Sequence, residues 1–188
     1  MIFPTWRKKI AATGKGKIEE RILESSFLSH WVDFCNLDAL KEIGQDNEVA
    51  FYMHHDNMAI AEYLKPLLPD FVKIVSYNDI VSFSSIVNES RMLVTDYSSF
   101  SFDFLYLNKP VVYYDFDENA RKSNVRGSEY DRFGYYCTNT EEASEALEAV
   151  LARDFVIDPR FSENIAALYP YRNVDHCKLI IEATVVPD

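Results

Sequence analysis

The sequence has 188 residues, 48% of them hydrophobic and 14% aromatic, so the chain has enough apolar material for a domain-sized core. Its formal net charge of −11 argues against a nucleic-acid partner, which requires clustered Lys and Arg, and against binding to an anionic membrane. The basic residues between positions 7 and 17 fit a solvated face, or a contact to phosphate groups or an acidic membrane.

Four short apolar runs predict buried strands. None of them alternates cleanly with polar residues, so we expect helices to cover both faces of the sheet. The runs are Val49–Met53, Phe71–Val75, Met92–Thr95 and Val111–Tyr114.

Longer amphipathic stretches between and after these runs predict helices. The candidates are residues 18–43, 57–64, 79–88, 99–107, 141–152 and 175–184. Thr140 is expected to cap the helix at 141–152. Strands that alternate with helices predict the α/β class, with a doubly wound, Rossmann-like parallel sheet. In such sheets ligands bind beside the carboxyl ends of the strands.

Cysteine usage and hydropathy predict a cytoplasmic protein. Cys35, Cys137 and Cys177 are widely spaced and match no metal-ligand pattern, so we expect reduced thiols and no metal site. No apolar stretch approaches the roughly 18 residues of a membrane-spanning helix, and the first residues lack the order of a signal peptide. Any contact with the inner face of the cell membrane is expected to be peripheral.

The segment after the third run carries the strongest functional signal. A buried strand ends at Thr95, and Ser98 and Ser99 stand at the start of a helix. Unpaired backbone amides and the helix dipole make such a position a seat for phosphate or pyrophosphate. Ordinary capping by Asp96, Ser98 or Ser99 is the alternative. No glycine-rich loop is present, so the segment is neither a P-loop nor a dinucleotide fingerprint, and no cofactor is expected.

The same segment resembles the signature of the CDP-glycerol glycerophosphotransferases, which build teichoic-acid-type polymers. Thr-Asp-Tyr-Ser-Ser, then Phe-Asp, then Lys-Pro before a Val-Val-Tyr-Tyr strand stand in order over residues 95–114. The resemblance implies that the turn from Asp96 to Ser99 binds the pyrophosphate of CDP-glycerol, with Ser98 and Ser99 as phosphate ligands. Asp103 would orient the loop or pair with a cation, or act only as a hydrogen-bond partner on the helix.

Other segments resemble the same family. A Pro-Thr-Trp-Arg segment ends at Arg7, which is nominated as a phosphate contact. His54 takes the family's His position after the first run and would contact phosphate or assist the leaving group, although His55 stands where the family has Pro. Tyr77 would contact the cytosine, with packing as the alternative. Arg126 would neutralise phosphate charge as the nucleotide leaves.

The acidic residues after the fourth run are expected to be loop and surface residues. The alternative is that they contact a hydroxyl of the donor glycerol. They are Asp115, Asp117 and Glu118. The family does not share the cation-binding Asp-x-Asp motif of the other large glycosyltransferase class, so no metal role is expected for them.

The resemblance implies transfer of glycerol phosphate from CDP-glycerol to a polyprenyl-linked or poly(glycerol phosphate) acceptor, with CMP as the leaving group. Residues 1–188 would form a single donor-binding domain, the C-terminal half of a glycosyltransferase-B fold. The family's acceptor domain would lie ahead of this chain and is absent from it. The alternatives are a CDP-ribitol or nucleotide-sugar transferase domain, and a non-catalytic remnant that binds a nucleotide or a partner enzyme.

Overall fold

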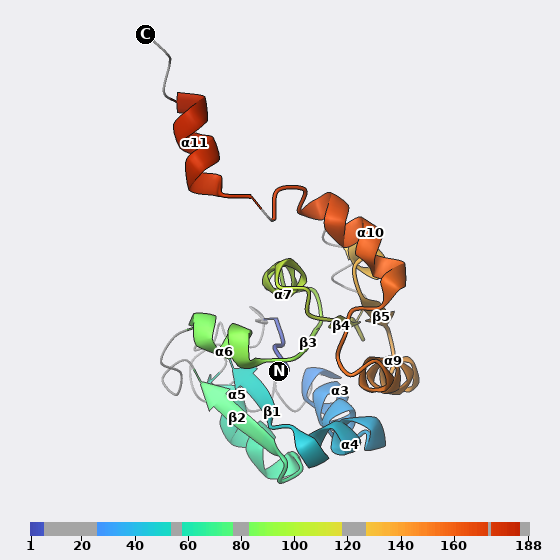
Figure 1. The fold of residues 1–188 in the computed structure, drawn as a ribbon. Helices are drawn as coiled ribbons and strands as arrows, with labels where there is room; N and C mark the ends of the chain where they lie inside the picture. Colours follow the sequence, from blue (N-terminus) through green and yellow to red (C-terminus); the bar gives the residue numbers. More distant parts are fainter. Residues whose placement is uncertain (6–25, 54–57, 77–82, 118–126, 173, 185–188) are drawn as a thin grey trace.

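Parallel strands form the centre of the molecule in the computed structural model, which describes residues 1–5, 26–53, 58–76, 83–117, 127–172 and 174–184 (Figure 1). The four predicted apolar runs all form strands. The strands are β1 (Val49–Met53), β2 (Val72–Ser76), β3 (Leu93–Thr95), β4 (Val111–Tyr114) and β5 (Tyr135–Cys137).

The first residues of the chain join the strands into one parallel arrangement. Strand β1 pairs with β2, and β4 pairs with both β3 and β5. Ile2 bridges Phe51 of β1 and Val94 of β3, both in parallel. With residues 1–3 counted as the first strand, the order across the sheet is 3-2-1-4-5-6, which is the Rossmann order. The order reverses between residues 1–3 and β3, and this is the topological switch point.

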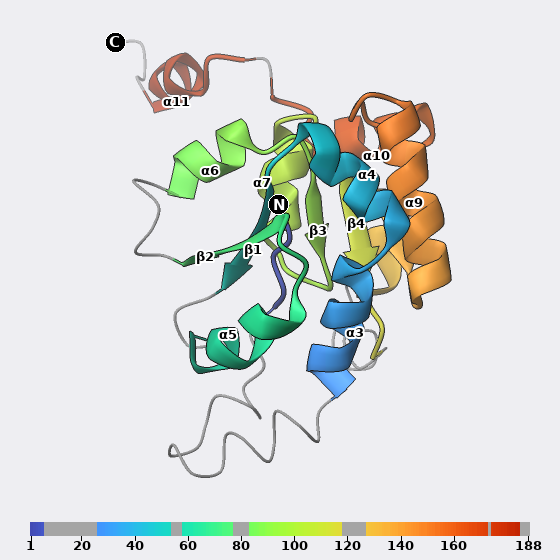
Figure 2. The same cartoon turned by 90° about the horizontal axis from the view of Figure 1, so that it is seen from below.

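Helices cover both faces of the sheet, as the apolar runs predict (Figures 1 and 2). One face packs against α3 (Ser26–Cys35), α4 (Asp38–Asp46), α5 (Met58–Leu64) and α9 (Thr140–Ala152). The other packs against α6 (Phe83–Glu89), α7 (Ser101–Tyr106), α10 (Pro159–Leu168) and the 3₁₀ segment η4 (Gly127–Arg132). A second 3₁₀ segment, η2 (Lys65–Leu67), follows α5.

Neighbouring residues of one strand serve opposite faces. Val112 and Tyr114 belong to the first core, and Val111 and Tyr113 to the second. Trp31 of α3 is fully buried in the first core, and its ring makes edge contacts with five aromatic rings. Those rings are Phe27, Phe34, Phe51, Tyr114 and Phe116.

Three details of the helices differ from the sequence expectations. The described part of the predicted helix 18–43 is two helices, because the chain turns at Asn36 and Leu37 between α3 and α4. The cap of α9 is Asn139 rather than Thr140, since the Asn139 side chain accepts a hydrogen bond from the Glu142 amide at 2.9 Å. Helix α10, which Asp158 caps, was not predicted.

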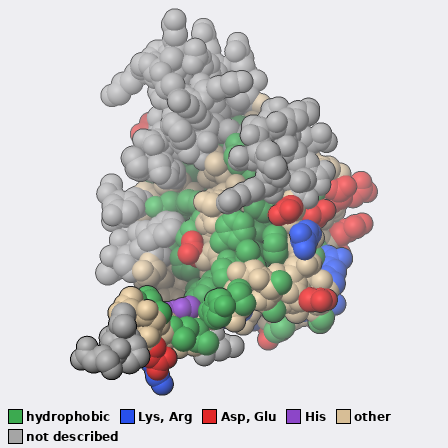
Figure 3. Space-filling model, turned by 90° about the horizontal axis from the view of Figure 1, so that it is seen from above, with side chains coloured by type: hydrophobic (Ala, Val, Ile, Leu, Met, Phe, Trp, Pro, Cys, Tyr) green, Lys and Arg blue, Asp and Glu red, His purple; other side chains and the backbone are tan. Residues whose placement is uncertain are grey.

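Helix α11 (His176–Thr184) confirms the last predicted helix but lies apart from the rest of the molecule (Figures 1 and 2). It has no buried residue, and Leu179, Ile180 and Ile181 are exposed. Figure 3 views the molecule from this side and shows hydrophobic side chains exposed on the surface. Within the described ranges, no helix has both the length and the apolar character needed to cross a bilayer.

Candidate functional site

The switch point brings two loops together at the carboxyl edge of the sheet. One leaves residues 1–3 through Pro4 and Thr5, and the other leaves β3 through Asp96. The Thr95 hydroxyl donates to the Phe3 carbonyl at 2.6 Å, which joins the two strand ends. In doubly wound sheets this crevice is where ligands bind.

Asp96 connects the two loops. Its side chain is fully buried, and Oδ1 accepts hydrogen bonds from the Thr5 amide at 3.0 Å, from the Thr5 hydroxyl, and from the Tyr97 amide at 2.7 Å. These bonds fix the start of both loops. The structure therefore places Asp96 beneath the turn, bound to protein groups, and leaves its predicted contact to a substrate as a prediction.

Ser98 and Ser99 form the turn between Asp96 and α7, which we call the serine turn (residues 96–100). The Ser98 hydroxyl accepts from the Phe100 amide at 3.2 Å, so ordinary local capping does occur here. The carbonyls of Ser98 and Ser99 accept from the amides of Ser101 and Phe102. Among the described residues, none accepts a hydrogen bond from the amides of Ser98 and Ser99 themselves. Ser99 is exposed, and the two amides are the donors available to an anion.

Asp103 lies on the exposed surface of α7, one helical turn beyond Ser99. It lines a shallow groove between α6 and α7 together with Asn88 and Tyr106. Its negative charge also contributes to the raised pKa of Tyr169, after the larger effect of burial. The structure thus shows where Asp103 lies, and its role in binding stays a prediction.

Asp115 corrects the expectation that the acidic residues after β4 are surface residues. Only 2% of Asp115 is exposed, and the Tyr136 hydroxyl donates to its Oδ2 at 2.6 Å. In the described part of the chain no group donates to its Oδ1. Burial raises the pKa of Asp115, and the nearby charges of Asp117 and Asp96 raise it further. Asp117 is half-buried.

Metal ligands do not gather at this edge in the described part of the chain: no group of three His, Cys, Asp or Glu side chains there could hold a metal ion. Four predicted site residues, Arg7, His54, Tyr77 and Arg126, lie outside the described residues. The structure therefore brings Asp96, Ser98 and Ser99 together at the switch point, and Asp115 follows the end of the neighbouring strand β4.

Lys109 of the signature has a structural role that the sequence did not reveal. Its Nζ donates to the carbonyls of Val87 and Asn88, both at 2.6 Å, in the last turn of α6. A cation at a helix C-terminus satisfies open carbonyls and interacts favourably with the dipole. Desolvation lowers the pKa of Lys109. Lys109 therefore fixes α6 to the loop that enters β4.

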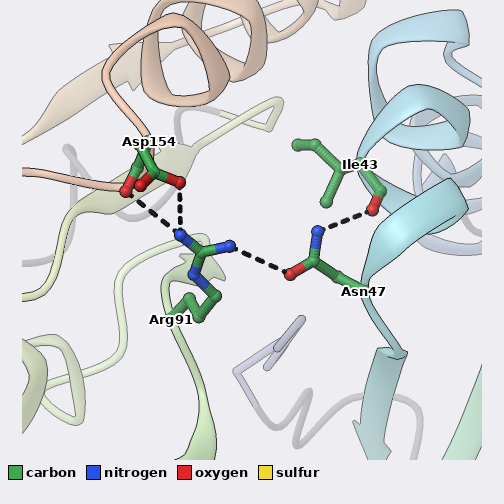
Figure 4. Close-up of polar contacts among 4 residues, drawn as sticks. All are labelled: Ile43, Asn47, Arg91 and Asp154. Atoms are coloured by element: carbon green, nitrogen blue, oxygen red, sulfur yellow. Dashed lines mark hydrogen bonds and ion pairs between the residues drawn. The ribbon is translucent and has the colours of Figure 1, made fainter.

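A cavity of about 540 Å³ lies at the opposite, amino-terminal edge of the sheet. Its lining includes Val49, where β1 begins, Met92, which precedes β3, and Phe155. Beside it, Arg91 donates to the Asp154 carboxylate at 2.5 Å and to Asn47 at 3.4 Å (Figure 4).

The Arg91 guanidinium lies 4.0 Å from the centre of the Phe155 ring. Asp154 and Phe155 both have left-handed backbone angles, with φ of 50° and 61°, so Arg91 holds a strained turn after α9. Because ligands of parallel sheets bind at the carboxyl edge, we place the functional site at the serine turn and not in this cavity.

Comparison with solved structures supports the fold. The chain resembles solved structures of the wall teichoic acid polymerase TagF. One matches with a TM-score of 0.59 and 24% identity, over 94% of this chain and 39% of that chain. A second matches with a TM-score of 0.54 and 20% identity. These structures confirm the predicted glycosyltransferase-B-like fold.

Sequence relatives come from teichoic acid synthesis. A teichoic acid glycerol-phosphate transferase of Staphylococcus aureus is 35% identical over 130 residues, 68% of this chain and 28% of that protein. A teichoic acid poly(glycerol phosphate) polymerase of Bacillus spizizenii is 29% identical over 174 residues, 88% of this chain and 38% of that protein. The minor teichoic acid biosynthesis protein GgaB of Bacillus subtilis is 32% identical over 127 residues, 63% of this chain and 14% of that protein.

The chain thus spans between 14% and 38% of the length of these relatives. A family model described as CDP-glycerol:poly(glycerophosphate) glycerophosphotransferase matches residues 1–173, nearly the whole chain. The relatives named above are thus a glycerol-phosphate transferase, a poly(glycerol phosphate) polymerase and a teichoic acid biosynthesis protein. The chain therefore belongs to the CDP-glycerol:poly(glycerophosphate) glycerophosphotransferase family.

Proposed function

We propose that this chain binds CDP-glycerol at the serine turn and supplies the donor side of a glycerol-phosphate transferase. The observation that carries the proposal is the pair of Ser98 and Ser99 amides, which have no acceptor among the described residues and stand at the switch point of a Rossmann-ordered sheet. Donors of this kind suit the pyrophosphate of a nucleotide. Family membership supports a cytidine-linked glycerol donor.

The proposed reaction transfers glycerol phosphate to a hydroxyl of a polyprenyl-linked or poly(glycerol phosphate) acceptor. The acceptor oxygen bonds to the phosphorus that carries the glycerol, the bond from that phosphorus to the bridging oxygen breaks, and CMP leaves with that oxygen. Phosphoryl transfer of this kind requires in-line positioning and neutralisation of charge on the phosphate oxygens. The serine turn contributes neutral donors to the pyrophosphate.

Four residues outside the described ranges complete the proposed donor site. Arg7 would bind phosphate oxygens in a bidentate manner, and Arg126 would neutralise the charge that grows on CMP. His54 would donate to a phosphate oxygen or to the leaving group. Tyr77 would contact the cytosine. In this proposal the chain is the donor half of the enzyme. The acceptor binds elsewhere, and a general base there takes the proton of the acceptor hydroxyl.

The proposal predicts that the double variant Ser98→Ala/Ser99→Ala loses donor affinity. Each hydroxyl that bonds a charged phosphate contributes about 1.5–3 kcal/mol, so we expect a loss of at least about tenfold in the affinity for CDP-glycerol. The measurement is calorimetric titration of the protein with CDP-glycerol.

A matched control is the double variant Ser144→Ala/Ser162→Ala, which removes two serine hydroxyls from the surfaces of α9 and α10. It should bind like the wild type. Titrations with CDP-ribitol, CMP and a UDP-sugar test the identity of the donor. Equal affinity of the wild type and Ser98→Ala/Ser99→Ala for CDP-glycerol would remove the two hydroxyls from the site and leave only the backbone amides, which this variant keeps. If CDP-ribitol or a UDP-sugar binds more strongly than CDP-glycerol, that compound is the donor and the assignment of CDP-glycerol is wrong.

A further inference from the structure

A tyrosine on the far side of the serine turn contacts its backbone directly. Tyr130 lies in η4, and its hydroxyl donates to the Tyr97 carbonyl at 3.1 Å. Only 8% of Tyr130 is exposed, and its ring stacks on Tyr113 of β4 with 4.7 Å between the ring centres. A sheet residue therefore holds the ring in place, and the ring places its hydroxyl on the turn.

We infer that Tyr130 is a positioning residue of the donor site, which aims the Ser98 amide by fixing the peptide plane between Tyr97 and Ser98. This inference rests on the proposed function of the serine turn. Tyr130 would touch no substrate atom and would act through the backbone of the turn.

The argument depends on the planarity of the peptide unit. The Tyr97 carbonyl and the Ser98 N–H belong to the same planar group and point in opposite directions when the bond is trans, as all peptide bonds in the described chain are. A donor fixed on the carbonyl therefore fixes the direction of the N–H. Hydrogen bonding at the carbonyl also polarises the amide, which strengthens the N–H as a donor by a modest fraction.

The peptide plane on the other side of Tyr97 is fixed as well. Asp96 Oδ1 accepts from the Tyr97 amide at 2.7 Å, and the same oxygen is held by the amide and hydroxyl of Thr5. Both planes that flank Tyr97 are thus tied to separate segments of the chain. The loop after residues 1–3 ties one plane, and η4 ties the other.

Tyr130→Phe is the direct test, because it removes the hydroxyl and keeps the ring on Tyr113. A matched control is Tyr169→Phe, since the Tyr169 hydroxyl donates to the Phe102 carbonyl at 2.7 Å, within the body of α7 and not in the serine turn. Both variants lose one bond from a tyrosine hydroxyl to a backbone carbonyl. Chemical denaturation of both variants measures how far their stabilities differ.

Two readouts follow from the inference. Tyr130→Phe should weaken CDP-glycerol binding about three- to tenfold, as expected when one hydrogen bond no longer organises the site, while Tyr169→Phe should change it by less than about twofold. Amide hydrogen exchange of the peptide that covers residues 97–100 should speed up in Tyr130→Phe and stay unchanged in Tyr169→Phe.

The inference is overturned if Tyr130→Phe matches Tyr169→Phe in both affinity and exchange. Its failure is separate from a failure of the proposed function. If the wild type binds no CDP-glycerol, the donor assignment is wrong, and the exchange comparison still decides whether Tyr130 orders the turn. If Ser98→Ala/Ser99→Ala loses affinity while Tyr130→Phe behaves like its control, the donor site stands and Tyr130 has no part in it.

Discussion

Asp96 and Asp115 stand at the ends of neighbouring strands and differ in their surroundings. Asp96 Oδ1 accepts two backbone amides and the Thr5 hydroxyl. The Asp115 carboxylate accepts from the Tyr136 hydroxyl and lies near the charges of Asp96 and Asp117. Burial and like charge both disfavour an ionised Asp115, so its pKa is raised above the ordinary value of 3.8.

This difference predicts a pH dependence for Asp115→Asn. A carboxyl whose folded pKa is raised stabilises the fold below its unfolded pKa, and this contribution is lost as the pH rises through the folded pKa. The asparagine still accepts from Tyr136 but does not ionise. We therefore expect the free energy of unfolding of Asp115→Asn to rise relative to the wild type as the pH increases from 3.8 through the raised pKa of the folded state. Urea denaturation across this range measures it.

Asp158 provides a control of opposite sign. Although burial acts against it, the bonds from the Arg160 amide and Tyr135 and the charges of Arg153 and Arg160 lower the pKa of Asp158. Its stabilising effect is present above the unfolded pKa and is lost as the pH falls through the folded one. Asp158→Asn should therefore lose stability relative to the wild type as the pH rises. A difference for Asp115→Asn that follows the sign of Asp158→Asn would contradict the raised pKa.

At the level of single residues, the sequence pattern identifies part of the candidate site. Hydroxyl residues between a buried strand and a helix identified Ser98 and Ser99, because that order is a local property of the chain. The bond between Thr5 and Asp96 joins residues that are 91 positions apart, and no local pattern indicates it. The burial of Asp115 was mispredicted because carboxylates are almost never buried without a partner.

Strand β5 shows how the elements constrain one another. Gly134 comes just before it, and a Cβ at this position would clash with the Val111 carbonyl oxygen and touch the Tyr113 ring at 3.0 Å. The absence of a side chain therefore lets β5 approach β4. This strand was not predicted, because Tyr135–Cys137 is only three residues long and two of them are partly exposed.

Two glycine variants test this packing. Gly134→Ala should lower the free energy of unfolding by about 1–3 kcal/mol, since backbone must move to admit the methyl group. Gly44→Ala in α4 meets the side chain of Phe71 at 2.7 Å, which can shift, and gains helix propensity of up to about 1 kcal/mol. Its net change should stay within about 1 kcal/mol of zero. Urea denaturation compares them, and equal destabilisation by both would contradict the role of Gly134.

The elements that sequence predicted best are those with long or purely apolar patterns. All four apolar runs became strands, and α9 spans nearly the predicted residues. The break between α3 and α4 was missed because apolar residues keep helical spacing across it: Phe34, Leu37 and Leu40 stand three positions apart. Tertiary packing decides such a break, and periodicity alone does not record it.

At the scale of the whole molecule, the three cysteine thiols differ in how far they are buried. All are free, Cys35 and Cys137 are buried, and Cys177 on α11 is exposed. Burial raises the pKa of Cys35 and of Cys137 to about 12, so both remain protonated thiols at neutral pH in the folded state.

This arrangement predicts that a thiol reagent labels Cys177 rapidly and the other two only when the fold opens. Mass spectrometry of the labelled native protein should find one modified cysteine, and the unfolded protein should show three. Cys177→Ser serves as the control and should show almost no fast labelling. Fast modification of Cys35 or Cys137 in the native protein would mean that the core opens locally.

The central position of residues 1–3 has a consequence for biosynthesis. Within the sheet, this strand is synthesised before its two neighbours, which lie near residues 50 and 94, so it must wait for later segments before it can pair. Strands β1 and β2 can pair before that, because little chain separates them. The nascent chain therefore exposes Met1, Ile2 and Phe3 to the cellular milieu until β3 has emerged, and closure of the sheet around them is a late step of folding.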